Sequence, residues 1–273
     1  MAYKRILTIQ DISCVGQCSM TVALPILSAC GHEVCILPTA ILSTHTGGFG
    51  KPAVVHLDDT LNSMWRHWQE QGITFDAIYT GYLGSLAAVK TAAEIADHLL
   101  APDGVLIVDP AMADHGKLYS GLDEVYAATM AELCKKADIL IPNLTEAAML
   151  SGQNYREIME KSYVNLLLDG LNNPVVILTG VGYEKGCTGV VMKQGEKRTS
   201  FSHRRLDKNF HGTGDIFASA FTGAFVQGKT VEQAVEIASK YVLRCVELTA
   251  EAPAHWYGVR FESVLGELKE MLI

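Results

Sequence analysis

The feature that most constrains the fold is a regular alternation of short apolar segments with helical patterns. Six segments have the pattern of β-strands: Arg5–Gln10, Glu33–Leu37, Ala77–Thr80, Val105–Asp109, Ile139–Pro142 and Val175–Thr179. Helical patterns occupy the intervals between them, at Ser19–Ala29, Thr60–Gln71, Leu86–Leu99, Leu122–Lys136 and Tyr155–Leu168. This alternation is typical of parallel strands joined by crossover helices. It predicts an α/β fold with a doubly wound, mostly parallel sheet between helices.

The last third of the chain departs from this alternation. The segments Gly186–Met192 and Lys197–Phe201 predict an antiparallel hairpin that turns at Gln194-Gly195. Three helices are predicted to close the chain, at Asp215–Gln227, Val231–Glu247 and Phe261–Leu272. The sequence has no linker rich in Pro, Gly or Ser and no repeat, so residues 1–273 are predicted to form one domain.

Composition limits the partners and the location. The net charge is −8 and there is no basic run, so nucleic acid is not an expected partner. The apolar runs are too short to span a bilayer, and the N-terminus is too brief for a secretory signal, so no membrane association is expected. The 7 cysteines include no C-x-x-C pair, which favours buried reduced thiols over a zinc site. Reduced thiols in turn favour a cytoplasmic location.

Polar residues follow four of the predicted strands. Ligands of doubly wound sheets bind at the carboxyl ends of the strands, so residues at those ends are expected to share one rim. The residues concerned are Asp11, Asp109, Asn143 with Glu146, and Thr179 with Gly180. Four separated segments therefore predict one ligand site.

The segment His211–Asp215 has the sequence His-Gly-Thr-Gly-Asp and precedes an apolar helix of small residues. Helix N-termini hold anions through unpaired N–H groups, and glycines allow close backbone approach. A carboxylate in such a turn suits taking the proton from a hydroxyl that attacks a phosphoryl group. This predicts a small-molecule kinase with Gly212, Thr213 and Gly214 as the anion hole and Asp215 as the base. The alternative is a helix cap at Asp215 after loop glycines.

The same position at a helix N-terminus predicts a lowered pKa for Asp215.

The segment Asn143-Leu-Thr-Glu146 has two interpretations. It fits a capping box, and it also places a carboxylate where a kinase needs one for Mg²⁺. Asp109 is either a strand-ending turn residue or a second carboxylate near the phosphates. We predict Mg²⁺ at Asp109 and Glu146, and nucleotide contacts from these two, Asn143, Thr179 and Gly180.

Two loops suit a flat aromatic substrate. The segment Ser43–Phe49 combines hydroxyls, His45, Thr46 and Gly47 with an aromatic ring, although a mobile surface loop is the alternative. Tyr82 follows a predicted strand and offers a second ring face. Aromatic faces with hydrogen-bonding side chains favour a heteroaromatic ring over a sugar.

One segment imitates another nucleotide site. Gly223–Thr230 matches the P-loop pattern G-x-x-x-x-G-K-[ST], which must follow a strand and open a helix. Here the preceding residues belong to a predicted helix. Gly228 is therefore expected to follow the end of that helix, and Thr230 is expected to form a capping box with Gln233.

Taken together, these motifs resemble the pyridoxal kinases of the ribokinase-like superfamily. The shared elements are Ile9-Gln10-Asp11, His45-Thr46-Gly47, Thr80-Gly81-Tyr82, Asp109-Pro110, Asn143-x-x-Glu146 and Gly212-Thr213-Gly214-Asp215, in the family's order and spacing. They extend over essentially the whole chain. The segment Tyr257–Glu262 also resembles the tail of bacterial pyridoxamine kinases.

The resemblance implies a three-layer ribokinase-like fold and ATP-dependent phosphorylation of the 5′-hydroxymethyl group of pyridoxal, pyridoxine or pyridoxamine. It implies ATP and Mg²⁺ as cofactors and a homodimer, and it leaves open a monovalent cation such as K⁺. The implied vitamer-binding residues are Asp11, His45, Thr46, Gly47, Tyr82 and Asp215. The chain departs from better-known members at Asp11, where they carry Ser against the pyridine ring. A carboxylate there could pair with a protonated ring nitrogen or with the amine of pyridoxamine.

Other functions stay open at this point. Hydroxymethylpyrimidine kinase has the same expected fold and a similar flat substrate, whereas a sugar or nucleoside kinase fits the aromatic loops less well. A non-catalytic ligand-binding protein on a kinase scaffold is an alternative of another class. The intact Gly-Thr-Gly-Asp motif argues against it, because a degenerate site should lose its base.

Overall fold

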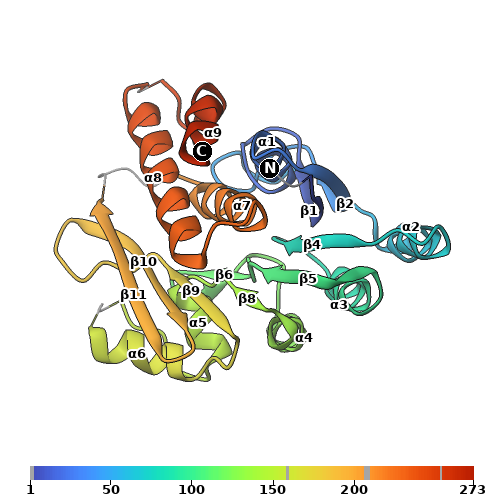
Figure 1. Ribbon diagram of the computed structural model, residues 1–273, viewed down its shortest axis with the longest axis horizontal. Coiled ribbons are helices and arrows are strands. Elements are labelled where there is room, and N and C mark those ends of the chain that lie inside the picture. Colours follow the sequence, from blue (N-terminus) through green and yellow to red (C-terminus); the bar gives the residue numbers. More distant parts are fainter. Residues whose placement is uncertain (1–2, 158–159, 206–209, 253) are drawn as a thin grey trace.

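A sheet of nine strands runs through the molecule with helices on both of its faces (Figure 1). The computed structural model describes residues 3–157, 160–205, 210–252 and 254–273. In sheet order the strands are β11 (Lys197–Arg204), β10 (Cys187–Gln194), β9 (Val175–Thr179), β8 (Ile139–Leu140), β5 (Leu100–Val108), β4 (Phe75–Thr80), β1 (Arg5–Ser13), β2 (Glu33–Leu42) and β3 (Val54–His56). All six predicted strands and the hairpin are present, so the predicted α/β class is confirmed.

Strand β1 marks the point at which the order of the sheet reverses. It pairs in parallel with β2 on one side and with β4 on the other. The strands from β4 through β5 and β8 to β9 continue in parallel, and β3, β10 and β11 add antiparallel edges. Such a reversal opens a crevice at the carboxyl ends of the two strands beside it. The crevice between β1 and β4 is therefore the natural ligand site of this sheet.

The helices form one layer on each face of the sheet (Figure 1). One layer comprises α1 (Met20–Ala29), α7 (Thr213–Val226), α8 (Val231–Ala250) and α9 (Leu265–Met271). The other comprises α2 (Asp58–Glu70), α3 (Leu86–Leu99), α4 (Glu124–Lys136), α5 (Leu144–Leu150) and α6 (Lys161–Asp169). Successive residues of β1 enter opposite cores, Ile6 on the α7 side and Leu7 on the α3 side. This is the pattern of a strand that is covered on both faces.

Several short elements were not predicted. These are β3, the seven-residue helix α5, and a small hairpin of β6 (Ala113–Asp114) and β7 (Lys117–Leu118). The helix predicted from Tyr155 begins only at Lys161, and residues 158 and 159 lie outside the described residues. The Tyr163 hydroxyl donates to the Asn154 carbonyl and accepts from the Arg156 N–H, which holds this segment away from helical geometry. The last predicted helix is divided into a 3₁₀ turn (Glu262–Val264) and α9.

Two further expectations can be compared with the structure. All seven cysteines are free, and four of them are buried, whereas Cys14 is exposed. Across the described part of the chain, no helix combines the length and the apolar character that crossing a membrane requires.

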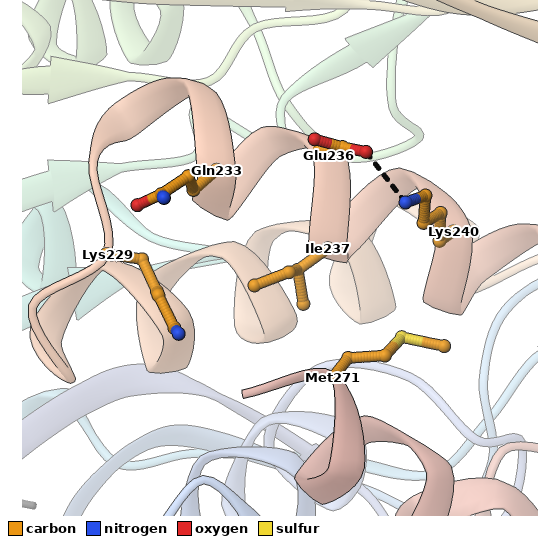
Figure 2. A pocket seen from close by; sticks show the side chains of 6 residues that line it. All are labelled: Lys229, Gln233, Glu236, Ile237, Lys240 and Met271. Carbon is orange, nitrogen blue, oxygen red and sulfur yellow. Dashed lines mark hydrogen bonds and ion pairs between the residues drawn. The ribbon is translucent and has the colours of Figure 1, made fainter. Parts of the chain in front are cut away.

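The segment that imitates a P-loop forms a helix end, as expected. Gly228 follows α7 with φ 99°, and Thr230 and Gln233 form the capping box of α8. Lys229 lines a surface groove of about 290 Å³ with residues of α8 and with Met271 (Figure 2). Helix α7 has 14 residues, about 20 Å at 1.5 Å per residue. The groove therefore lies at the opposite end of α7 from the Gly-Thr-Gly turn.

Candidate active site

Backbone hydrogen bonds bring the predicted rim residues together, although Asp11 lies within β1, at a register shift between Gln10 and Ile12, and not after the strand as predicted. The Asp11 N–H donates to the Tyr82 carbonyl at 3.1 Å, which links β1 to the segment after β4 at the crevice. The Asp109 N–H donates to the last carbonyl of β4 at 3.0 Å, and the Thr179 N–H donates to the Pro142 carbonyl at 2.9 Å. The predicted convergence of these segments is therefore present in the structure.

The Gly-Thr-Gly turn depends on a glycine at its first position. Gly212 lies in the left-handed region at φ 85°, and a Cβ there would approach the Gln17 carbonyl oxygen to 2.5 Å. Its carbonyl accepts from the Ile216 N–H at 3.0 Å, so Gly212 occupies the N-cap position of α7. Asp215 lies in the first turn of the helix. The alternative in which Asp215 is the helix cap is therefore wrong.

The predicted lowering of the Asp215 pKa is also wrong. Burial raises the pKa of Asp215 to about 6, a backbone hydrogen bond from Ser19 lowers it, and the charge of Asp11 raises it further. Loss of water around the carboxyl therefore outweighs the favourable end of the helix dipole. A base with this pKa is mostly ionised at pH 7, yet it accepts a proton more readily than an ordinary aspartate.

Asp11 forms the floor of the crevice. Its side chain is 2% exposed and accepts a hydrogen bond from the Ser13 hydroxyl at 2.9 Å. Burial raises the pKa of Asp11, while hydrogen bonds from Ser19 and Ser13 lower it. Ser19 thus contacts both Asp11 and Asp215, and the two carboxyls lie within electrostatic reach of one another.

Asn143 and Glu146 form the capping box of α5. The carboxylate that was predicted to hold Mg²⁺ is the same buried Glu146 carboxylate. Glu146 is 1% exposed; one of its oxygens accepts from the Asn143 N–H at 2.9 Å and the other from the Met112 N–H at 2.9 Å. Burial raises the pKa of Glu146 to about 7 despite these hydrogen bonds. The β6–β7 hairpin is attached here, because the Asn143 side chain donates to the Ala113 carbonyl at 2.7 Å.

Asp109 lies within electrostatic reach of the Glu146 and Asp215 carboxyls. Burial raises its pKa well above the usual range, and the charges of Glu146 and Asp215 raise it further. Its hydrogen-bond donor is the Ala111 N–H at 3.1 Å. One or two carboxylates together with phosphate oxygens commonly hold Mg²⁺, and Asp109 and Glu146 are the candidates here. In the portion of the chain that the structure describes, three or more His, Cys, Asp or Glu side chains do not form an all-protein metal cage.

Thr179 and Gly180 end β9 on the same rim. Thr179 pairs with Asn143 in an isolated parallel bridge, which joins the predicted nucleotide residues to the capping box. Gly180 has φ 77° and has open space where a side chain would be. This edge therefore leaves the backbone after β9 accessible.

The loop after β2 folds toward the Gly-Thr-Gly turn. The His45 Nδ1 accepts from the Gly47 N–H at 3.0 Å, and the His45 ring centroid lies 5.2 Å from that of His211. Burial and the neighbouring His211 lower the pKa of His45. Thr46 is exposed, and Tyr82 is half-buried next to Asp11, whose N–H donates to the Tyr82 carbonyl. The loop, the turn and the crevice therefore share one site.

Some residues of the site were missed by the sequence analysis. The side chains of Ser13 and Ser19 hold the Asp11 carboxyl, the backbone of Ser19 holds that of Asp215, and His211 was part of the motif without a predicted role. A Cβ at Gly16 would lie 2.5 Å from the His45 Cβ, so the loop Gly16–Gln17 packs against both His45 and Gly212. Gly16 and Gln17 have φ of 136° and 52°, and only the glycine signals such a loop in the sequence.

A profile described as phosphomethylpyrimidine kinase matches residues 27–259. The chain belongs to the pyridoxal kinase and phosphomethylpyrimidine kinase family. It is similar to the pyridoxal kinase of Lactobacillus plantarum, with a TM-score of 0.91 and 30% identity over 99% of this chain and 98% of that one.

A Bacteroides thetaiotaomicron protein that carries the description phosphomethylpyrimidine kinase, in a crystal form with pyridoxal, gives 0.89 and 33% over 98% and 96%. Among curated proteins, the pyridoxine/pyridoxal/pyridoxamine kinase of Bordetella avium is 27% identical over 89% of this chain and 85% of its own length. The family therefore includes kinases of both substrate descriptions, and the matches cover 98%, 96% and 85% of these three proteins.

Proposed function

We propose that this kinase transfers the γ-phosphoryl group of ATP to the 5′-hydroxymethyl oxygen of a vitamin B6 vitamer. The observation that carries the proposal is the position of Asp215. It follows the Gly-Thr-Gly turn at the start of α7 and lies within electrostatic reach of Asp11 in the β1–β4 crevice. The proposed phosphate-binding turn and the floor of the crevice thus meet at one carboxyl. Relatives named as pyridoxal kinases support the choice of substrate.

In the proposed mechanism, Asp215 accepts the proton of the 5′-hydroxyl as its oxygen attacks the γ-phosphorus. The bond from the γ-phosphorus to the bridging oxygen breaks, and ADP leaves with that electron pair. The raised pKa of Asp215, about 6, suits this role because the carboxyl is ionised at neutral pH and still basic enough to take the proton. The N–H groups of the Gly212–Gly214 turn stabilise the charge on the transferring group.

The nucleotide is proposed to extend across the strand ends toward Asn143, Thr179 and Gly180. Mg²⁺ held near Asp109, with Glu146 reaching it through water, would neutralise charge on the phosphates. Glu146 suits a water-mediated role because backbone N–H groups already occupy both of its oxygens. Asp109 has a single backbone donor and is the better candidate for direct contact.

The vitamer ring is proposed to lie between Tyr82 and the loop that carries His45, Thr46 and Gly47, above Asp11. A buried carboxylate there favours a cationic partner, either the protonated ring nitrogen or the amine of pyridoxamine. We further propose that residues 1–273 act as one kinase domain, because one sheet includes strands from both ends of the chain. The proposed homodimer rests on the family resemblance alone, and the proposed cytoplasmic location rests on the cysteine content of the sequence.

The test is steady-state phosphorylation with MgATP and each of four acceptors: pyridoxal, pyridoxine, pyridoxamine and hydroxymethylpyrimidine. Turnover of a B6 vitamer is the expected result. Turnover of the pyrimidine alone would assign the chain to the second function, which the description of the family profile favours. Lack of turnover with all four would reject the proposal and leave a sugar kinase or a non-catalytic binding protein.

A further inference from the structure

We propose that the segment His255–Gly258, near the C-terminus, positions the vitamer-binding loop, and that Trp256 is its main contact. The inference rests on the proposed function for the identity of the substrate. The segment follows α8, more than 200 residues away in sequence from the loop Ser43–Phe49. It is nevertheless the part of the chain against which the tip of that loop packs.

The contacts between the two segments are aromatic. The Phe49 ring centroid lies 4.7 Å from that of Trp256 and 5.2 Å from that of Tyr257. Trp256 and Tyr257 meet edge to face at 5.2 Å. A Cβ at Gly48 would lie 3.0 Å from the Trp256 ring, so the glycine allows the ring to lie directly on the loop backbone. The Phe49 side chain therefore packs against two aromatic rings instead of extending into solvent.

A second connection joins this segment to the catalytic turn. The side chains of His255 and Gln17 are in hydrogen-bond contact at 3.1 Å, and Gln17 donates to Glu262 at 2.6 Å. A Cβ at Gly258 would lie 2.8 Å from the Gln17 Cβ, and the Gln17 carbonyl in turn packs on Gly212. The C-terminal segment thus contacts the vitamer loop directly and the Gly-Thr-Gly turn through Gln17.

Trp256 is poorly placed for a role in the core. Its side chain is 61% exposed, whereas Trp65 is fully buried. A large exposed ring adds little to global stability, but an aromatic pair at this distance fixes the orientation of its partner. Trp256 therefore acts through Phe49 and Gly48, as a positioning residue for the loop that closes on the ring of the vitamer.

The test compares Trp256→Ala with the wild-type enzyme. Loss of the Trp256 ring, which contacts both Phe49 and Tyr257, is expected to raise KM for the vitamer about tenfold, with kcat and KM for ATP nearly unchanged. Trp256→Phe should restore most of the affinity. Tyr3→Ala is the matched control, because Tyr3 is 75% exposed and lies near the amino end of β1, away from the site. Phe49→Ala, which also removes the contact with Tyr257, should raise the vitamer KM at least as much as Trp256→Ala, and the double variant should add nothing to the effect of Phe49→Ala.

Hydrogen exchange of residues 43–50 in the ligand-free protein supplies a readout that needs no substrate. Trp256→Ala should speed exchange in this loop and leave the α3 and α4 amides unchanged. Unchanged exchange and unchanged KM would overturn the proposal, as would additive effects of the two variants. If the wild-type protein phosphorylates no vitamer, the proposed function fails, and the exchange experiment still decides whether the segment holds the loop.

Discussion

The pKa values of the carboxyl groups shift in opposite directions at the two ends of the central sheet. At the amino end, Lys4 contacts Asp76 at 2.7 Å and Arg5 contacts Glu33 at 3.2 Å. Partial burial raises the pKa of Asp76, but its bonds to Lys4 and Arg5 outweigh this and the net pKa is lowered. At the carboxyl end, Asp11, Asp109, Glu146 and Asp215 all have raised pKa values, and burial is the largest cause in each case.

The difference lies in the partners. The hydrogen bonds found for the four carboxyls at the carboxyl end come from neutral donors, namely serine hydroxyls and backbone N–H groups. Neutral donors hold a carboxylate in place without cancelling its charge. The carboxyl end is therefore prepared for positive charge that arrives with a ligand, whereas the amino end is already neutralised by its own lysine and arginine. The carboxyl end of the sheet thus suits ligand binding, whereas the ion pairs at the amino end contribute to solubility and modest stability.

The largest expected effect comes from the backbone of the anion-binding turn. Gly212→Ala places a Cβ 2.5 Å from the Gln17 carbonyl at a positive φ, so the turn must move. We expect kcat to fall by about 10² to 10³, the cost of losing oxyanion-type donors. The control is Gly266→Ala in α9, where a Cβ meets open space and kcat should not change. Equal turnover of the two variants would remove the turn from the mechanism.

Next in size is the removal of charge from the centre of the acidic cluster. Asp109→Asn should lower kcat/KM for MgATP about tenfold or more, because it removes the carboxylate that is proposed to contact the metal. The same change should stabilise the ligand-free protein at pH 8, since Glu146 and Asp215 no longer face a third charge. Thermal unfolding measures the second effect. A variant that is less active and also less stable at pH 8 would contradict this account.

Asp11→Ser tests the floor of the crevice. A charge-assisted hydrogen bond is worth enough to change selectivity about tenfold, so the ratio of kcat/KM for pyridoxamine over pyridoxine should fall by about that factor. Steady-state kinetics with both vitamers measures it. An unchanged ratio would show that Asp11 does not pair with the amine of pyridoxamine and would leave the ring nitrogen, which both vitamers share, as its partner.

The acidic end also predicts the pH dependence of stability. Raised pKa values mean that the folded state holds protons more tightly than the unfolded state. The resulting stability is fully present below about pH 4 and is lost as the pH rises through about 6 for Asp215 and about 7 for Glu146. The ligand-free protein should therefore melt at a lower temperature at pH 8 than at pH 5.5. Glu146→Gln should flatten this slope, and an identical slope in both proteins would argue against the assignment.

The smallest effect is expected at the amino end. The Lys4 and Asp76 side chains are 41% and 33% exposed, and exposed ion pairs contribute about 0 to 1 kcal/mol. Asp76→Asn should leave kcat and both KM values unchanged and lower stability by less than about 1 kcal/mol. Its lowered pKa gives the opposite sign of pH dependence, with stability lost only as the medium becomes acidic. A kinetic effect comparable to that of Asp109→Asn would erase the contrast between the two ends.

The sequence predicted most of the sheet and the rim because both follow from local patterns. Alternating strands and helices give parallel pairing, and residues after parallel strands must share an edge. The short elements β3 and β6–β7 escaped prediction because two or three residues carry no periodicity; they form where neighbouring strands and the α5 capping box offer hydrogen-bond partners.

The electrostatics and the long-range contacts could not be predicted. The pKa of Asp215 depends on how much water the folded chain removes, which a helix position alone does not reveal. The contact of Trp256 with Phe49 joins segments about 200 residues apart, and nothing near either residue signals it. Ser19 was not predicted as a site residue for the same reason, since only the fold brings it into contact with both Asp11 and Asp215.

The most direct test of the central claim is the turnover of Asp215→Asn with MgATP and the best vitamer. The substitution keeps the shape of the side chain and removes its ability to take a proton. We predict that kcat falls by about 10² or more while both KM values change little, in line with the loss of a general base. Turnover at the wild-type rate would show that Asp215 is not the base and that the carboxyl end of the sheet serves binding alone.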